Sequence, residues 1–134
     1  MTTLQLNTSL PQTYRNNGQH LEQVVRYTLT GTLQKADNLP ANAGTDCLQY
    51  SIKSARATIC KGTDVKEHLK TDKAKAFIYA TKQGIAYIMD RAEYLDFVQA
   101  FGTVTRESTK NGGAIKTRLG HETSKMLEWL AERA

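Results

Sequence analysis

The chain has 134 residues, 40% of them hydrophobic, and a formal net charge of +5. This length supports one hydrophobic core and excludes two ordinary domains, and no run approaches the ~20 apolar residues of a membrane helix. The first residues lack the pattern of a secretory signal, and the two cysteines and three histidines form neither a disulfide framework nor a zinc motif. We therefore expect a soluble, cytoplasmic protein.

Positive charge is concentrated in the middle of the chain. Residues 46–82 carry eight basic and four acidic side chains, whereas residues 83–134 carry seven of each. A positive surface of this kind either binds phosphates, gaining affinity by counterion release, or is an ordinary lysine-rich surface. The basic residues concerned are Lys53, Arg56, Lys61, Lys66, Lys70, Lys73, Lys75 and Lys82.

The chain begins with residues 1–17, which are rich in Thr, Gln and Asn. This composition predicts an N-terminal arm or irregular edge, followed by a single domain over residues 18–134. Apolar residues at helical spacing predict a helix over residues 18–30, ended by Gly31.

The next segment contains a loop and a strand. Turn-forming residues predict a loop over residues 32–45, with a short strand at 32–35. Leu48, Tyr50 and Ile52 then alternate with Gln49, Ser51 and Lys53, which predicts a strand that reads as central in the sheet. The alternation changes phase after Ser54, and a β-bulge would account for this change.

Two further elements follow in the basic segment. Asp64 and Glu67 have the spacing of a capping box, so they predict a short helix over residues 65–72. Residues 75–90 contain two apolar runs separated by Lys82, Gln83 and Gly84, which predicts a β-hairpin.

The last third of the chain repeats the order of helix and hairpin. Asp90 and Glu93 predict a capped helix that ends at Gly102. A second hairpin is predicted to turn at residues 111–113, and a C-terminal helix follows over residues 122–134. Together the elements predict a mixed α/β fold, with one central, largely mixed β-sheet flanked by helices.

Several polar residues between positions 18 and 60 have a recognisable order. Glu22 lies early in the first predicted helix, Asp46 precedes the predicted strand, and Ser51-Ile52-Lys53-Ser54 lies within it. This order resembles the motif of the restriction-endonuclease-like nucleases. These enzymes bind a divalent metal with an aspartate and a (D/E)-x-K motif on a neighbouring strand, often together with a glutamate from the first helix. The resemblance implies a restriction-endonuclease-like core that hydrolyses phosphodiester bonds.

The resemblance also implies a role for each residue. Glu22 and Asp46 would bind Mg²⁺, with Mn²⁺ as a substitute, and Lys53 would orient or help to deprotonate the attacking water. Ser51 stands where the family has an acidic residue, so Gln49 or Ser51 would complete the metal shell through a neutral oxygen. On one regular strand Asp46 would point away from Lys53, so a bulge or a turn at residues 46–48 is needed, and Asp37 is the alternative ligand.

Hydroxyl and basic side chains outside this motif are predicted to contact the nucleic acid. Those that flank the turn at residues 111–113 lie on a two-stranded ribbon, which can enter a groove of a duplex; the alternative is a solvated hairpin. The predicted contacts are Ser54, Arg56, Thr58, Lys61, Arg106, Lys110, Lys116 and Arg118.

The function favoured by the sequence is a Mg²⁺-dependent endonuclease that acts on double-stranded DNA in preference to RNA. We expect a homodimer or higher homo-oligomer, because cutting both strands of a duplex takes two active sites. Two alternatives stay open: a nucleic-acid-binding module without catalysis, and a small protein-interaction protein such as a phage-type inhibitor.

Overall fold

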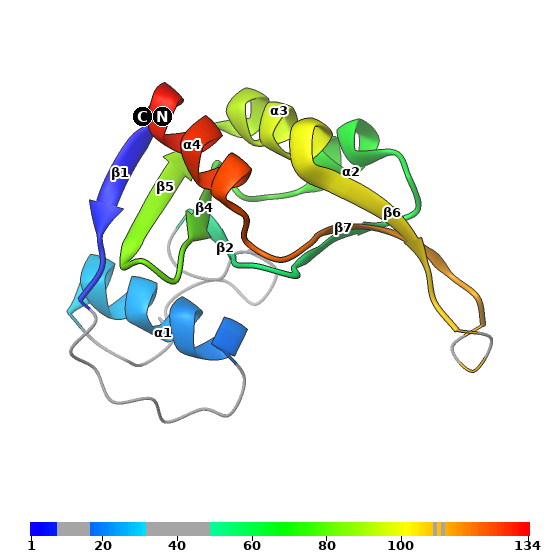
Figure 1. Cartoon of the computed structure of the whole chain (residues 1–134), viewed down its shortest axis with the longest axis horizontal. Coiled ribbons are helices and arrows are strands. Elements are labelled where there is room, and N and C mark those ends of the chain that lie inside the picture. Colours follow the sequence, from blue (N-terminus) through cyan, green and yellow to red (C-terminus); the bar gives the residue numbers. More distant parts are fainter. Residues whose placement is uncertain (8–16, 32–48, 109, 111) are drawn as a thin grey trace.

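The computed structural model describes residues 1–7, 17–31, 49–108, 110 and 112–134 (Figure 1). This part of the chain forms four helices and two β-sheets, one of four strands and one of three. The predicted mixed α/β class is confirmed. The prediction of one sheet is wrong, because the strands divide between two. None of the described helices is both long enough and apolar enough to cross a membrane.

The four-stranded sheet has the strand order β1-β5-β4-β2. Strands β2 and β4 are parallel, whereas β5 is antiparallel to both of its neighbours, so this sheet is mixed as predicted. The hairpin predicted over residues 75–90 is confirmed as β4 and β5. The four strands are β1 (Thr2–Gln5), β2 (Tyr50–Lys53), β4 (Ala76–Ala80) and β5 (Ile85–Met89).

Strand β1 corrects the expected N-terminal arm. Residues 2–5 pair with β5, and Leu6, only 4% exposed, packs in the core beside Val24 and Val25. The Thr and Gln content of this segment hid an alternation in which Leu4 and Leu6 share one face. Residues 8–16 lie outside the described part of the chain.

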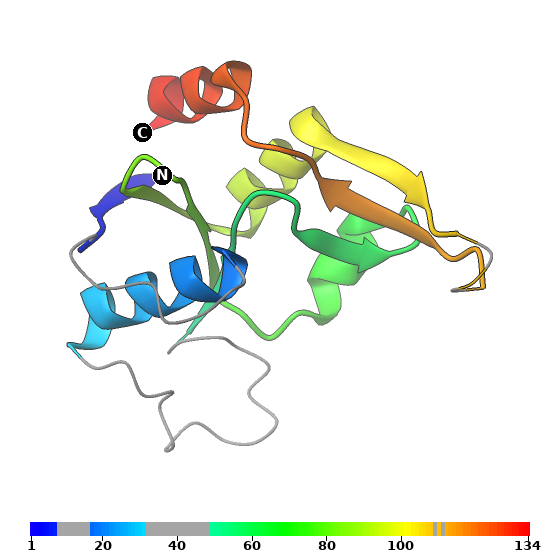
Figure 2. The same cartoon turned by 60° about the horizontal axis from the view of Figure 1, so that its bottom comes forward.

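The helices cover the two faces of the four-stranded sheet. Helix α1 (Asn17–Thr30), as predicted over residues 18–30, packs on one face through Val24 and Val25. The other face carries Phe77 and Tyr79 against a larger core, to which the remaining helices contribute (Figure 2). These are α2 (Val65–Thr71), α3 (Arg91–Phe101) and α4 (Ser124–Arg133), and all three confirm predicted helices.

Local hydrogen bonds explain where the helices begin. The carboxylate of Asp90 accepts from the Glu93 N–H at 2.8 Å, and the Glu93 carboxylate accepts from the Asp90 N–H at 3.1 Å, which completes the predicted capping box. Asp64 caps α2 in the same way, since its Oδ1 accepts from the Glu67 N–H at 3.0 Å. The carboxyl-terminal boundary of α3 lies at Gly102, where a Cβ would come 2.5 Å from the carbonyl oxygen of Val98.

Two tyrosines lie deep in the larger core. Tyr94 stacks on Phe77 with ring centroids 4.2 Å apart, and its hydroxyl makes no hydrogen bond within the described residues. The Tyr79 hydroxyl donates to the sulfur of Met126 at 3.9 Å. Burial raises the pKa of both phenols well above the ordinary value for tyrosine.

The chain passes from the first sheet to the second after β2. Residues 55 and 56 form a turn in which Arg56 has a φ of 64°, and the Ala57 N–H donates to the Ser54 carbonyl at 3.3 Å. The phase change after Ser54 therefore marks a passage between sheets, and the predicted bulge at that point is wrong. A register shift does occur one strand later, between Thr58 and Cys60.

The three-stranded sheet has the order β3-β7-β6 and is antiparallel throughout. Its strands are β3 (Thr58–Lys61), β6 (Gly102–Arg106) and β7 (Ile115–Leu119). Strands β6 and β7 form the second predicted hairpin, a ribbon whose tip extends beyond β3 and away from the rest of the fold (Figures 1 and 2). Near its tip, Gly112 and Gly113 adopt positive φ angles of 79° and 64°, as expected of turn glycines.

Candidate nucleic-acid interface

Strand β2, which carries the predicted catalytic residues Ser51 and Lys53, is an edge strand of its sheet among the described residues. The described residues therefore place at an edge a strand that the sequence indicated as central. Ser51 pairs with Phe77 and Lys53 with Tyr79, so both side chains point toward the larger core. Ser51 is only 6% exposed, and Lys53 is half-buried.

Gln49 lies just before β2, and its side chain is exposed. Its carbonyl oxygen accepts a hydrogen bond from the Lys75 N–H at 2.9 Å, which extends the contact between β2 and β4 by one residue. Because Gln49 lies two residues before Ser51, the predicted catalytic residues follow one another along a single chain segment.

The predicted metal ligand Glu22 lies on the other side of the four-stranded sheet. Its carboxylate forms an ion pair with Arg26 at 3.0 Å on α1. Tyr50 and Ile52 are the β2 residues that pack against α1, so Ser51 and its neighbour Lys53 face away from that helix. The sheet therefore separates Glu22 from the β2 residues with which it was predicted to act.

Asp46 and the alternative ligand Asp37 lie outside the described residues. Within residues 1–7, 17–31, 49–108, 110 and 112–134, no cluster of three or more His, Cys, Asp or Glu side chains is arranged to hold a metal ion. Of the predicted catalytic and metal-binding set, the structure thus groups only Gln49, Ser51 and Lys53, which share one strand and its entry.

The predicted nucleic-acid contacts have a different arrangement. Directly paired residues of antiparallel strands project to the same side of a sheet. The pairings across the three-stranded sheet therefore form two rows on one of its faces. These rows are Thr58, Arg118 and Thr103, followed by Lys61, Lys116 and Thr105.

We call this surface the basic face, and define it as those six residues together with Arg56 in the preceding turn. The opposite face of the same sheet is buried by Cys60, Thr117 and Leu119, which pack toward the larger core. The two faces of the sheet thus have opposite character, because one closes the core and the other presents hydroxyl and cationic groups to solvent.

Hydrogen bonds fix several groups of the basic face. The Arg118 guanidinium donates to the Arg56 carbonyl at 3.2 Å, which ties the turn between the sheets to β7. The Lys116 ammonium forms an ion pair with Glu107, at the end of the ribbon next to β6. The side chains of Arg56 and Lys61 are exposed. With four cations against the carboxylate of Glu107, this face retains a positive charge.

The structure therefore brings together four of the predicted basic contacts from two distant segments: Arg56, Lys61, Lys116 and Arg118. Two others lie elsewhere on the ribbon. Arg106 projects from the opposite face and donates to the Gly113 carbonyl at 3.4 Å, and Lys110 is exposed near the tip.

Ser54 is half-buried at the end of β2 and is not part of the basic face as the strand pairings define it. The sequence interpretation omitted Thr103 and Thr105. Their alternation with Val104 was the available signal, since it places both hydroxyls on one side of a strand.

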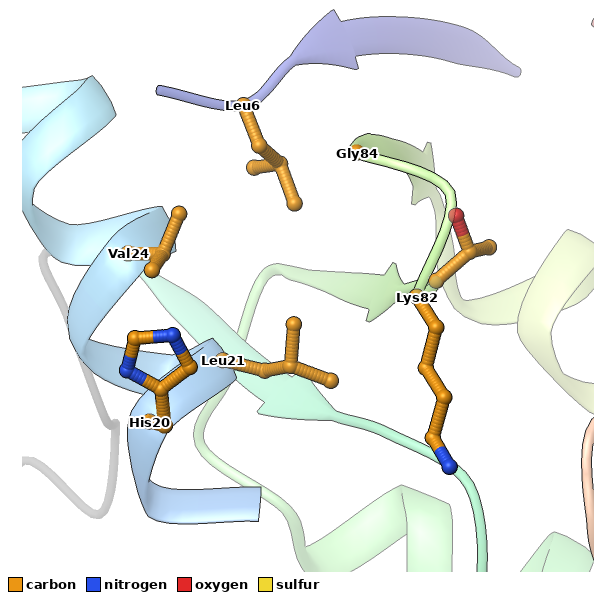
Figure 3. A pocket seen from close by; sticks show the side chains of 7 residues that line it. Leu6, His20, Leu21, Val24, Lys82 and Gly84 are labelled. Atoms are coloured by element: carbon orange, nitrogen blue, oxygen red, sulfur yellow. The ribbon is translucent and has the colours of Figure 1, made fainter. Parts of the chain in front are cut away.

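A separate pocket of about 300 Å³ lies on the side of the four-stranded sheet covered by α1. Leu6, Leu21 and Val24 form its apolar wall, while His20 and Lys82 flank Leu21 (Figure 3). None of the described residues that line it is acidic. The pocket therefore does not have the lining of a divalent-metal site.

Comparisons with models of protein families, with curated proteins and with solved structures found no match. The chemistry of the basic face and of β2 is therefore the basis for assigning a function.

Proposed function

We propose that this protein binds double-stranded nucleic acid through the basic face of its three-stranded sheet. The observation that supports this proposal is that Lys61, Lys116 and Arg118 lie on one face of the sheet, with Arg56 held next to them through its carbonyl. Arg56 and Lys61 are exposed there, and Lys116 and Arg118 are half-buried. Side chains of this kind contact phosphate oxygens without reading the base sequence, and each contact releases a condensed counterion.

The threonines strengthen the proposal. Thr58, Thr103 and Thr105 lie in the same two rows as the cations and are exposed. Hydroxyl groups donate to phosphate and sugar oxygens, so they can hold the backbone in register while lysine and arginine supply the charge.

The shape of the ribbon favours DNA over RNA. Strand β3 pairs with β7 only as far as the end of the sheet, so the tip of the hairpin consists of two chain segments alone. A two-stranded ribbon of this kind fits the wide major groove of B-form DNA. The major groove of A-form RNA is deep and narrow, and side chains cannot read it. The exposed Lys110 near the tip and the basic face next to it would then lie along adjacent phosphates.

Mg²⁺-dependent cleavage by Lys53, Gln49 and Ser51 stays a prediction. Its proposed ligand Glu22 lies across the sheet from Lys53, and Asp46 lies outside the described residues. Adding Mg²⁺ or Mn²⁺ to the binding reactions tests this prediction directly, because hydrolysis would shorten the duplex.

The binding experiment compares two double variants that remove the same charge. Lys61→Gln with Arg118→Gln removes two cations from the basic face. Lys66→Gln with Lys125→Gln removes two exposed cations from helices α2 and α4, which pack against the opposite face. Affinity for a mixed-sequence DNA duplex is measured over a range of salt concentrations, and thermal unfolding shows that both variants fold.

We expect the first variant to reduce the log–log salt slope by about 2, since each lost phosphate contact changes it by roughly 1. The control should keep the wild-type slope, because Lys66 and Lys125 lie outside the basic face. Equal salt slopes for the two double variants would overturn the proposal. An equal loss of DNA affinity in both variants would also overturn it, because that result would reflect total charge and not the basic face. A parallel titration with an RNA duplex tests the preference for DNA.

A further inference from the structure

The outer edge of β6 is a further distinctive feature of the ribbon. This strand is the last of the three-stranded sheet, and no described residue pairs with its outer side. All of its residues after Gly102 are exposed. Natural proteins usually protect such an edge with lysine, proline or a bulge, but the middle of β6 is Thr103-Val104-Thr105.

Hydrogen bonds of the neighbouring strand show which backbone groups of β6 point outward. The Leu119 N–H donates to Ala57 at 2.9 Å, and the Ile115 carbonyl accepts from Gly62 at 2.6 Å, so these β7 residues face β3. Because the direction alternates along a strand, Lys116 and Arg118 must face β6.

Lys116 and Arg118 pair with Thr105 and Thr103, whose backbone groups are thus used inside the ribbon. The Glu107 N–H continues this pattern, since it donates to the Ala114 carbonyl at 2.8 Å. The alternate residues Val104 and Arg106 therefore direct their N–H and C=O groups to the outer edge. Gly102 is different, because its N–H bonds to the Val98 carbonyl.

The side chains along this edge carry little charge. Thr103 and Thr105 are neutral and lie on the basic face, one strand away from Lys116 and Arg118. On the other face, Val104 is 60% exposed and Ile115 is 37% exposed, and these are the exposed large hydrophobic residues of the described chain. Arg106, the one charged residue of β6, lies at the end of the strand and donates to the Gly113 carbonyl of its own hairpin. A second strand placed along β6 would therefore meet a neutral centre and would cover apolar surface.

We propose that β6 pairs antiparallel with β6 of a second copy of this chain, about a two-fold axis at Thr105. In this register Val104 lies opposite the partner's Arg106, and Arg106 lies opposite the partner's Val104. Both outward-pointing residues of each copy then form hydrogen-bonded pairs. Thr105 meets the partner's Thr105 in a non-hydrogen-bonded pair, a position where threonine side chains interact favourably.

Two observations favour this occupant and this register. Glu107 of one copy lies opposite the partner's Thr103, in the row that contains the partner's Arg118, so opposite charges share that row. An axis at Val104 would instead set Arg106 against the partner's Gly102, whose N–H is already bonded within its own chain. The Thr105 register leaves no outward donor of Val104 or Arg106 unused.

The dimer follows from the β6 edge alone and does not rest on the proposed nucleic-acid binding. It would join the two three-stranded sheets into one sheet of six strands. Since the direct pairs project to the same side, the basic faces of both copies would lie on the same surface of that sheet. Only this last consequence, a doubled phosphate-binding surface, depends on the proposed function.

The first test measures mass in solution by light scattering over a range of concentrations. We expect the wild type to have twice the mass of the 14.9 kDa chain. Val104→Lys, which places a charge at this neutral centre, should have the mass of one chain. Val104→Thr keeps a β-branched edge and should remain dimeric. A monomeric wild type, or a Val104→Lys variant that stays dimeric, would overturn the proposal.

The second test fixes the register. Residues that face each other in a non-hydrogen-bonded pair have Cα atoms about 4.5 Å apart, within the range of a disulfide. Thr105→Cys should therefore form a covalent dimer on mild oxidation, whereas Thr103→Cys, displaced from the axis, should not. Equal crosslinking of both variants would contradict the register. Nucleic-acid binding enters neither measurement, so the dimer can fail while the proposed function stands, and the reverse.

Discussion

The substitution Ser51→Glu tests whether position 51 belongs to the core or to a metal-binding site. The nuclease resemblance implies a carboxylate here, but Ser51 is only 6% exposed and pairs with the fully buried Phe77. Burial of a carboxylate typically raises its pKa by some units. At neutral pH, each unit of this rise lowers the unfolding free energy by about 1.4 kcal/mol. Added side-chain volume costs a further ~1–3 kcal/mol. We therefore expect Ser51→Glu to lose roughly 3–5 kcal/mol of unfolding free energy.

The assay is urea unfolding at several pH values, with Ser51→Ala as the control. The introduced carboxyl should be protonated in the folded protein at a pH where the unfolded chain, with a pKa of about 4.3, has already lost that proton. The unfolding free energy should therefore fall by about 1.4 kcal/mol per pH unit above this value, until the folded-state pKa is reached. Ser51→Ala introduces no charge, so it should lose only about 1 kcal/mol, with no such pH dependence.

Mn²⁺ completes the experiment. A metal that binds only the folded state raises the unfolding free energy in proportion to the logarithm of its concentration. The described residues group no second carboxylate with position 51, because Glu22 lies across the sheet from it, so we expect no such effect. A Ser51→Glu variant that keeps wild-type stability and is further stabilised by Mn²⁺, while Ser51→Ala is not, would refute this reasoning and support a metal site on β2.

Other predictions concern the core and the helix caps. Tyr94→Phe removes a buried hydroxyl that makes no hydrogen bond among the described residues, so urea unfolding should show a gain of about 1 kcal/mol. Burial raises the pKa of Tyr94 and Tyr79, so the unfolded chain loses these protons first as the pH rises above about 10. Unfolding free energy should therefore fall with pH in that range, and Tyr94→Phe should reduce the fall by about 1.4 kcal/mol per unit, measured by the same method. Asp90→Ala removes the capping box of α3 and should lower the thermal midpoint through a loss of about 1 kcal/mol, whereas an unchanged midpoint would show that the cap contributes nothing.

The elements that the sequence predicted correctly are those governed by local interactions. The Asp90 and Glu93 cap involves residues three apart, and each hairpin turn is set by a few adjacent residues. These signals act over one turn of chain, so they can be recognised without knowing what packs nearby. The helix boundaries were accordingly correct to within two residues, and both hairpins were correct.

Sheet membership was not predictable in the same way, because it depends on pairing between distant segments. Strands β2 and β3 are separated by only a few residues, yet they belong to different sheets. The phase change after Ser54 was visible, but a bulge and a turn between sheets leave the same trace in a sequence. The φ of 64° at Arg56 distinguishes them, and no residue type there indicates it.

The same limit applies to the candidate site. The basic residues were identifiable as phosphate contacts, but only the β3–β7 pairing brings Lys61 beside Lys116. Glu22 and Lys53 could be assigned to a helix and a strand, whereas the face of the sheet on which each lies depends on how α1 packs. Side-chain chemistry was therefore predictable, and the grouping of side chains into a surface was not.

The most direct test of nucleic-acid binding is the salt dependence of the wild-type protein's affinity for a mixed-sequence DNA duplex. If Arg56, Lys61, Lys116 and Arg118 each neutralise one phosphate, the log–log slope should be about −3.6, from roughly 0.9 per contact. Affinity should then fall by about two orders of magnitude between roughly 50 and 200 mM salt. A slope near zero, or no binding at the lowest salt concentration, would contradict the proposal that the basic face binds phosphate.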